Sequence, residues 1–151
     1  MPTITPFLWF ENQAEEAMQH YLSIFRNSKT ISVNRAGDRV SAVTFELDGQ
    51  RFMALNAGPH DKFNDAISFL VSCETQEEID YYWDKLTAGG GSESRCGWLK
   101  DRFGVSWQVV PTALGRLMSD PDPNKARATV DAMLKMKKLV VADLQKAHDG
   151  A

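Results

Sequence analysis

An internal repeat constrains this chain more than any other feature of its sequence. A shift of 62 positions aligns Phe7-Leu8 with Phe69-Leu70 and Glu15-Glu16 with Glu77-Glu78. Further along the chain the best shift falls to 52, which places Asn56 on Gln108, so the second copy is ten residues shorter. Two long copies indicate a duplicated supersecondary unit, because solenoids stack at least three repeats.

Each copy has the pattern of one strand, one helix and three further strands. In the first copy, apolar alternation and turn residues predict a helix with Asn12 as its N-cap, between strands at 3–10, 29–36, 40–47 and 51–56. In the second copy, Thr75 and Glu78 predict a capping box. The strands expected there lie at 66–73, near 92–96, at 97–100 and at 105–110. The predicted class is α+β, with two tandem βαβββ-type units that form curved mixed sheets, the second unit shortened.

From Thr112 onward the pattern becomes helical. A short helix is expected before the break at Pro121-Asp122-Pro123, and two more helices after it. We therefore expect a paired βαβββ domain over 1–111, with unit one at about 1–60 and unit two at about 61–111. Residues 112–151 should form a helical C-terminal extension that packs on the same core or on a partner chain.

Composition and charge exclude several classes of protein. The 151 residues include 17 Lys and Arg against 20 Asp and Glu, and the formal net charge is −3. Without a basic cluster a nucleic-acid partner is not expected. No run of 18 apolar residues is present, so no membrane partner is expected either. The N-terminus does not resemble a signal peptide, and Cys73 and Cys96 are too few for a disulfide scaffold, which predicts a cytoplasmic protein.

Several segments resemble a known family. They are Ile4–Phe10, Ala14–Ala17, Leu55–His60 with Phe63-Asn64, Ala66–Phe69, Cys96–Gly104, Ser106–Gln108 and Met118–Pro123. With the repeated βαβββ pattern, they resemble the PhnB-like branch of the vicinal oxygen chelate superfamily, also called glyoxalase/bleomycin-resistance. This branch is often labelled demethylubiquinone 3-methyltransferase-like. The resemblance implies a curved sheet from each unit that encloses a cavity, in a homodimer.

In metal-dependent members of that superfamily, His and Glu on the first and last strands of each unit hold a divalent ion. The corresponding positions here fall near Thr5 or Pro6, near Ala66 or Ser68, and at Asn56 and Gln108. Divalent ions prefer carboxylates and imidazoles, for which an uncharged amide is a weak substitute. We therefore expect no metal site and no cofactor.

The candidate ligand-binding residues are polar or aromatic groups on the expected strands and their connections. Asn56 and Gln108 end apolar strands at equivalent places of the repeat, and their amides can orient a ligand or serve structural hydrogen bonds. Aromatic rings can wall a cavity or fill a core. The full predicted set is Trp9, Asn56, Phe63, Ser68, Trp98, Phe103, Trp107 and Gln108.

Among the histidines, His60 lies in the loop between the two units, where it is a candidate general base or simply a loop residue. His20 and His148 are expected to be solvated, Trp83 and Cys73 to be core residues, and Asp101 to close a hairpin turn.

These residues favour a small-molecule-binding protein that holds a partly aromatic or apolar organic ligand in a curved-sheet cavity without an essential metal. The alternative is a metal-dependent isomerase, lyase or dioxygenase that uses His60. A second alternative is a protein-interaction module whose interface is the Met-rich C-terminal helices. Methyltransferase activity is not expected, because Gly89-Gly90-Gly91 follows a helix rather than a strand and no alternating βα units are present.

Overall fold

The computed structural model describes residues 2–151 and divides the chain into two compact units, residues 1–62 and 63–151. The first unit contains β1 (Phe7–Phe10), α1 (Ala14–Ile24), β2 (Ser28–Ala36), β3 (Arg39–Leu47) and β4 (Gln50–Asn56). Its sheet has the order β1-β4-β3-β2, in which β1 and β4 are parallel and the other pairs are antiparallel. The βαβββ pattern predicted for this half is confirmed.

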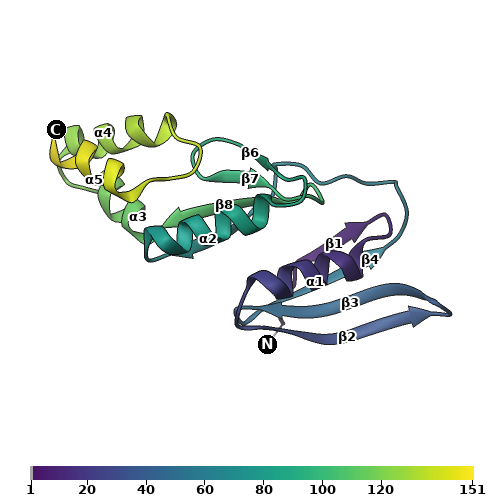
Figure 1. Ribbon diagram of the computed structural model, residues 1–151. Coiled ribbons are helices and arrows are strands. Elements are labelled where there is room, and N and C mark those ends of the chain that lie inside the picture. The colour runs from purple at the N-terminus through teal and green to yellow at the C-terminus, as the bar shows by residue number, and fades with distance from the viewer. Residues whose placement is uncertain (1) are drawn as a thin grey trace. The chain divides into compact units, whose positions relative to one another are not determined.

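The helix α1 lies across one face of this sheet (Figure 1). It buries Ala14, Ala17, Met18, Tyr21 and Ile24, the residues whose helical spacing predicted its apolar side. The Phe45 ring on β3 stacks on the Phe52 ring on β4, with centroids 5.5 Å apart, and Tyr21 lies 6.3 Å from Phe45. Alternate residues of β3 and β4 therefore form the core of the first unit.

The second unit repeats the topology with shorter strands. It contains β5 (Phe69–Cys73), α2 (Gln76–Thr87), β6 (Ser92–Glu93), β7 (Trp98–Lys100) and β8 (Ser106–Pro111), in the sheet order β5-β8-β7-β6. The hairpin between β2 and β3 in the first unit pairs eight positions, whereas β6 and β7 pair only two. The shortening expected from the change of shift lies in this hairpin.

The two sheet-covering helices differ in how they begin. The Thr75 hydroxyl caps α2 by accepting a hydrogen bond from the Glu78 amide at 3.2 Å, as the capping box predicted. The expected N-cap Asn12 is wrong, because α1 is preceded by Gln13, which makes no side-chain cap. Instead the Asn56 side chain, 42 positions away, accepts the hydrogen bond from the Ala14 amide at 2.8 Å. A sheet residue thus replaces the local cap.

Residues 112–151 belong to the second unit and contain α3 (Thr112–Met118), α4 (Pro123–Leu134) and α5 (Val141–Asp149). Figure 1 shows these three helices gathered together, in green to yellow. A cluster of Leu114, Leu117, Leu139 and Leu144 holds them, with Val110 of β8 packed against it. This hydrophobic contact anchors the helices to the end of the second sheet.

Hydrogen bonds to the backbone between α4 and α5 also hold the C-terminal helices on the second unit. The Gln76 side chain donates to the Leu139 carbonyl at 3.1 Å and accepts from the Val141 amide at 2.8 Å. The amides of Cys96 and Gly97 donate to the carbonyls of Met136 and Lys137, both at 2.8 Å. The segment between α4 and α5 is therefore bonded directly to α2 and to the residues before β7.

Candidate functional site

Strand alternation gives the second sheet one face that packs on α2 and one face that does not. The packed face carries Leu99, Trp107 and Val109, which are 1%, 3% and 0% exposed. Their neighbours in sequence point the other way. We call this other surface the open face and define it by Ser68, Leu70, Trp98, Lys100, Ser106 and Gln108.

Three of the predicted ligand-binding residues meet on the open face. Gln108 pairs with Leu70 of β5 on one side and with Trp98 of β7 on the other. Its amide Nε2 donates to the Ser68 hydroxyl at 2.9 Å. Leu70 remains 53% exposed, and Trp98, Ser68 and Gln108 are half-buried. An apolar surface, an aromatic ring and a polar pair therefore lie next to one another.

A charged group borders this arrangement. Lys100 lies directly opposite Ser106 in the β7–β8 ladder. The Ser106 hydroxyl donates to Asp65 at 2.6 Å, and the Lys100 ammonium lies 3.8 Å from the same carboxylate oxygen. Asp65 thus links the segment before β5 to the open face and balances the charge of Lys100 there.

Trp107, in contrast, serves the core rather than the open face. Its indole Nε1 donates to the Asp101 carboxylate at 2.9 Å, and Phe69 packs against its ring edge with centroids 5.4 Å apart. Asp101 is only 3% exposed and also accepts from the amides of Phe103 and Val105, at 2.9 and 3.0 Å. The prediction that Asp101 closes this hairpin is confirmed.

Two further aromatic residues of the predicted set lie apart from the open face. Phe103 is half-buried in the β7–β8 turn, with the Arg102 guanidinium 4.6 Å from its ring centroid. Phe63 is half-buried at the start of the second unit. Neither ring belongs to the strands that carry Gln108 and its neighbours.

The predicted residues of the first unit also have other surroundings. Trp9 pairs with Leu55 in the β1–β4 ladder and donates from Nε1 to the Gly58 carbonyl at 3.0 Å. The loop residue His60 is exposed. His20, which was expected to be solvated, is half-buried on α1.

The amide of Asn56 is occupied at both ends. Besides accepting from Ala14, it donates from Nδ2 to the Val40 carbonyl at 3.1 Å. Asn56 therefore lies on the side of its sheet that faces α1, whereas Gln108 lies on the side of its sheet that faces away from α2. The two amides, although at equivalent places of the repeat, therefore lie on opposite sides of their sheets with respect to the covering helix. The sequence shifts align positions on opposite faces of the two sheets, as the buried Leu8 and the exposed Leu70 also show.

The donor set does not fit a divalent cation of the kind that the resemblance implies. Asn56 Oδ1 is already a hydrogen-bond acceptor for α1, and Gln108 and Ser68 offer only neutral oxygens. Within residues 2–151 no group of three His, Cys, Asp or Glu side chains is placed to hold a metal ion. The Cys73 thiol is buried, and this burial together with Glu78 raises its pKa to about 11, so it is a protonated core residue.

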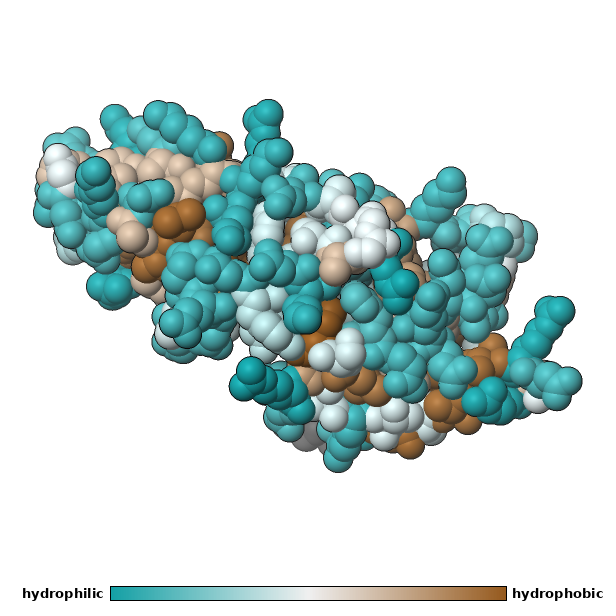
Figure 2. All heavy atoms as spheres, viewed as in Figure 1, coloured by the Kyte–Doolittle hydropathy of each residue, from teal (hydrophilic) through white to brown (hydrophobic). Residues whose placement is uncertain are grey.

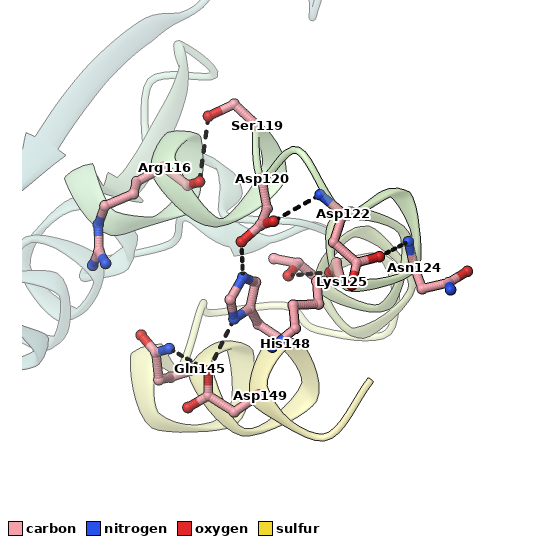
Figure 3. Close-up of polar contacts among 10 residues, drawn as sticks. Arg116, Ser119, Asp120, Asp122, Asn124, Lys125, Gln145, His148 and Asp149 are labelled. Atoms are coloured by element: carbon pink, nitrogen blue, oxygen red, sulfur yellow. Dashed lines mark hydrogen bonds and ion pairs between the residues drawn. The ribbon is translucent and has the colours of Figure 1, made fainter.

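The most distinctive ionisable cluster lies in the C-terminal helices and was missed from the sequence. Figure 3 shows the His148 ring between two carboxylates. Its Nε2 is 2.8 Å from Asp120 and its Nδ1 is 2.9 Å from Asp149. These hydrogen bonds raise the pKa of His148, and the bond to His148 lowers the pKa of Asp149. The pKa of Asp120 is lowered first by the hydrogen bond from the Asp122 amide and then by the bond to His148. The expectation that His148 is solvated is wrong, since its side chain is only 12% exposed. Asp120 lies 28 positions away, so no local spacing signals the pair.

The hydrophobic residues on one face of the molecule are dispersed. The face shown in Figure 2 is mostly hydrophilic, with hydrophobic residues in separate small patches. An open hollow of about 490 Å³ lies on α4 and α5, lined by Ala128, Asp143, Lys146, Ala147, Gly150 and Ala151. None of the predicted site residues borders it.

No helix formed by residues 2–151 has the length and apolar character needed to cross a membrane.

Comparison with known proteins assigns the first three quarters of the chain to a family. The family model described as 3-demethylubiquinone-9 3-methyltransferase matches residues 2–110. The PhnB protein from Bacillus cereus is 37% identical, with a TM-score of 0.68, over 74% of this chain and 100% of that chain. No curated protein matches. The family match ends before α3, so the three C-terminal helices lie outside it.

More distant structures share the fold. Protein PA1353 from Pseudomonas aeruginosa is 20% identical, with a TM-score of 0.64, over 74% of this chain and 98% of that chain. The fosfomycin resistance protein FosX from Listeria monocytogenes, solved with Mn(II) and a sulfate ion, is 15% identical, with a TM-score of 0.51, over 72% and 89% of the two chains. These matches confirm the expected glyoxalase/bleomycin-resistance fold. The family match and the 37% identical PhnB protein therefore show that the chain belongs to the PhnB-like 3-demethylubiquinone-9 3-methyltransferase family.

Proposed function

We propose that this protein binds a small organic molecule on the open face of its second sheet, without an essential metal. The observation that carries the proposal is the combination of the exposed Leu70, the half-buried Trp98 and the Gln108–Ser68 pair on one sheet surface. Ligand sites in proteins join apolar and aromatic walls to a few placed polar groups. An exposed leucine and a half-buried indole on either side of Gln108 form a surface that a ligand can cover.

The family description alone does not carry a methyltransferase activity to this chain. A methyl donor of the nucleotide type needs a phosphate- or ribose-binding turn between a strand and a helix. Here the triple glycine Gly89-Gly90-Gly91 follows α2, and both sheets are built from βαβββ units. Binding of an organic ligand is the function that the open face supports.

A screen of planar aromatic compounds by thermal shift, followed by calorimetry on the compounds that stabilise the full chain, tests the proposal. We expect Leu70→Ala to weaken binding about ten-fold, because a buried leucine loses about 1.5 kcal/mol or more of apolar contact. Val71→Ala is the matched control, since Val71 is the next residue of β5 and faces the opposite side. It should lower the melting temperature and leave affinity unchanged. Equal affinity in the wild type and Leu70→Ala would contradict the proposal.

The metal-dependent alternative has its own test. After incubation with Zn, Mn, Fe and Ni and removal of free ions, elemental mass spectrometry of the purified chain should find well under one metal per chain. About one metal per chain would replace this proposal with a metal-assisted isomerase, lyase or dioxygenase. Substitution of His60 would then show whether this exposed loop residue is a ligand.

The oligomeric state is a separate part of the proposal. The resemblance implies a homodimer, and light scattering coupled to gel filtration measures it. A dimer mass is expected, and a monomer mass at micromolar concentration would contradict this part alone.

A further inference from the structure

From the unused hydrogen-bonding atoms of the open face, we infer that its ligand is a neutral, planar molecule whose edge carries a hydrogen-bond donor beside an acceptor. This inference rests on the proposed function, because it names the ligand class for the same surface. It follows from the polar pair, the aromatic neighbour and the charge balance of that surface.

The Gln108–Ser68 hydrogen bond fixes which atoms remain for a ligand. Gln108 uses its Nε2 as donor, and the Ser68 oxygen is the acceptor. Within residues 2–151 the carbonyl oxygen of the Gln108 amide and the hydroxyl proton of Ser68 have no other partner. A side-chain amide carries two N–H donors and a carbonyl acceptor, so this pair leaves the Gln108 carbonyl and its second N–H beside the Ser68 hydroxyl donor. A ligand edge with a donor for the Gln108 carbonyl and an acceptor for the Ser68 hydroxyl engages both residues at once.

The aromatic neighbour defines the body of the ligand. Trp98 is directly paired with Gln108 across the β7–β8 ladder, and Leu70 is paired with Gln108 on the other side. A polar edge that reaches Gln108 therefore brings the rest of the ligand over an indole or over the exposed Leu70. Flat rings gain most from such a surface, because aromatic stacking adds to apolar burial.

The charges of the open face favour a neutral ligand. Its cation, Lys100, lies 3.8 Å from Asp65, and Asp65 also accepts the Ser106 hydroxyl proton. An anionic ligand that approaches Lys100 meets the like charge of Asp65 beside it, whereas a neutral ligand leaves this charge balance unchanged. A cyclic amide, with its N–H next to its C=O on a flat ring, has the required edge.

The test uses 2-quinolinone, its N-methyl derivative and quinoline-2-carboxylate, titrated into the full chain and followed by two-dimensional amide NMR. N-methylation removes the donor and keeps the ring and the carbonyl. We expect 2-quinolinone to bind about five-fold more tightly than the N-methyl derivative, and to shift the side-chain resonances of Gln108. Gln108→Met should abolish that preference, because it removes the acceptor. Leu70→Ala should weaken both compounds equally.

The outcomes separate this inference from the proposed function. If 2-quinolinone and its N-methyl derivative bind equally at the open face, the ligand class is overturned and the binding surface stands. If quinoline-2-carboxylate binds most tightly, the ligand is an anion and the neutral class is overturned. If none of the three compounds shifts open-face resonances, both the inference and the proposed function fail.

Discussion

The side-chain amide of Gln108 donates to the hydroxyl of Ser68 at 2.9 Å, across 40 positions of sequence. The amide of Asn56, its partner in the sequence repeat, is instead bound to the first turn of α1 and to β3. The side-chain amides at equivalent places of the two units therefore have different roles. One amide holds a helix on its sheet, and the other keeps an acceptor available on an open sheet face.

Removal of the two amides should therefore have different consequences. Asn56→Ala should lower the free energy of unfolding by about 2 kcal/mol, because it removes a helix cap and a second hydrogen bond. Gln108→Ala should change it by less than about 1 kcal/mol, since it loses only the bond to Ser68. Urea denaturation of both variants measures the difference. Equal losses in the two variants would show that Gln108 is as structural as Asn56.

Asp101 should be the most sensitive charged residue of the second unit. Asp101→Asn should destabilise the fold by about 3 kcal/mol, because a buried carboxylate that accepts three hydrogen bonds becomes an amide with one acceptor oxygen. Asp38→Asn, in the exposed turn before β3, is the control and should stay within about 0.5 kcal/mol. Chemical denaturation followed by tryptophan fluorescence measures both. If Asp101→Asn unfolds at the same denaturant concentration as the wild type, the role assigned to this carboxylate is contradicted.

Gly97 marks a place where only glycine fits. Its φ is +85°, and a Cβ there would lie 2.9 Å from the Val109 carbonyl oxygen and 3.1 Å from Leu139. We expect Gly97→Ala to cost more than about 2 kcal/mol, from backbone strain together with the clash. Gly104→Ala separates the two causes, because Gly104 has a φ of +90° but a Cβ added there would meet no atom within 4 Å. The melting temperature of Gly97→Ala should be clearly lower than that of Gly104→Ala. The reverse order of the two melting temperatures would contradict the clash.

The docking of α5 should depend on pH through His148. Its pKa is raised above 6.5, so its stabilising contribution is complete below pH 6.5 and is lost as pH rises through the raised value. The lowered pKa values of Asp120 and Asp149 give a contribution that is present above pH 3.8 and is lost as pH falls through those lowered values. Amide hydrogen exchange of α5, corrected for intrinsic rates, should show the strongest protection between these limits.

Substitution of the histidine provides the control for that profile. His148→Gln should remove the loss of α5 protection above pH 6.5, whereas His60→Gln, in an exposed loop, should leave it intact. A ring-proton titration of His148 that gives an ordinary or lowered pKa would contradict the geometry of the two carboxylates.

The elements were predictable from the sequence because each carries a local signal. Period and turn residues indicated both βαβββ units, and the capping box at Thr75 was correct. The cap of α1 was not predictable locally, since it comes from Asn56, and neither was the pairing of His148 with Asp120. Side-chain direction was the other failure. Trp107 and Trp98 are both aromatic strand residues, and only the β7–β8 register decides that the first lies in the core and the second on the open face.

The most direct test of ligand binding on the open face is to map where planar aromatic fragments bind on the full chain by two-dimensional amide NMR. We predict that shifts concentrate on the residues around Ser68, Leu70, Trp98 and Gln108. Shifts confined to the hollow on α4 and α5, around Ala128, Lys146 and Gly150, would contradict this prediction and move the binding site to the C-terminal helices.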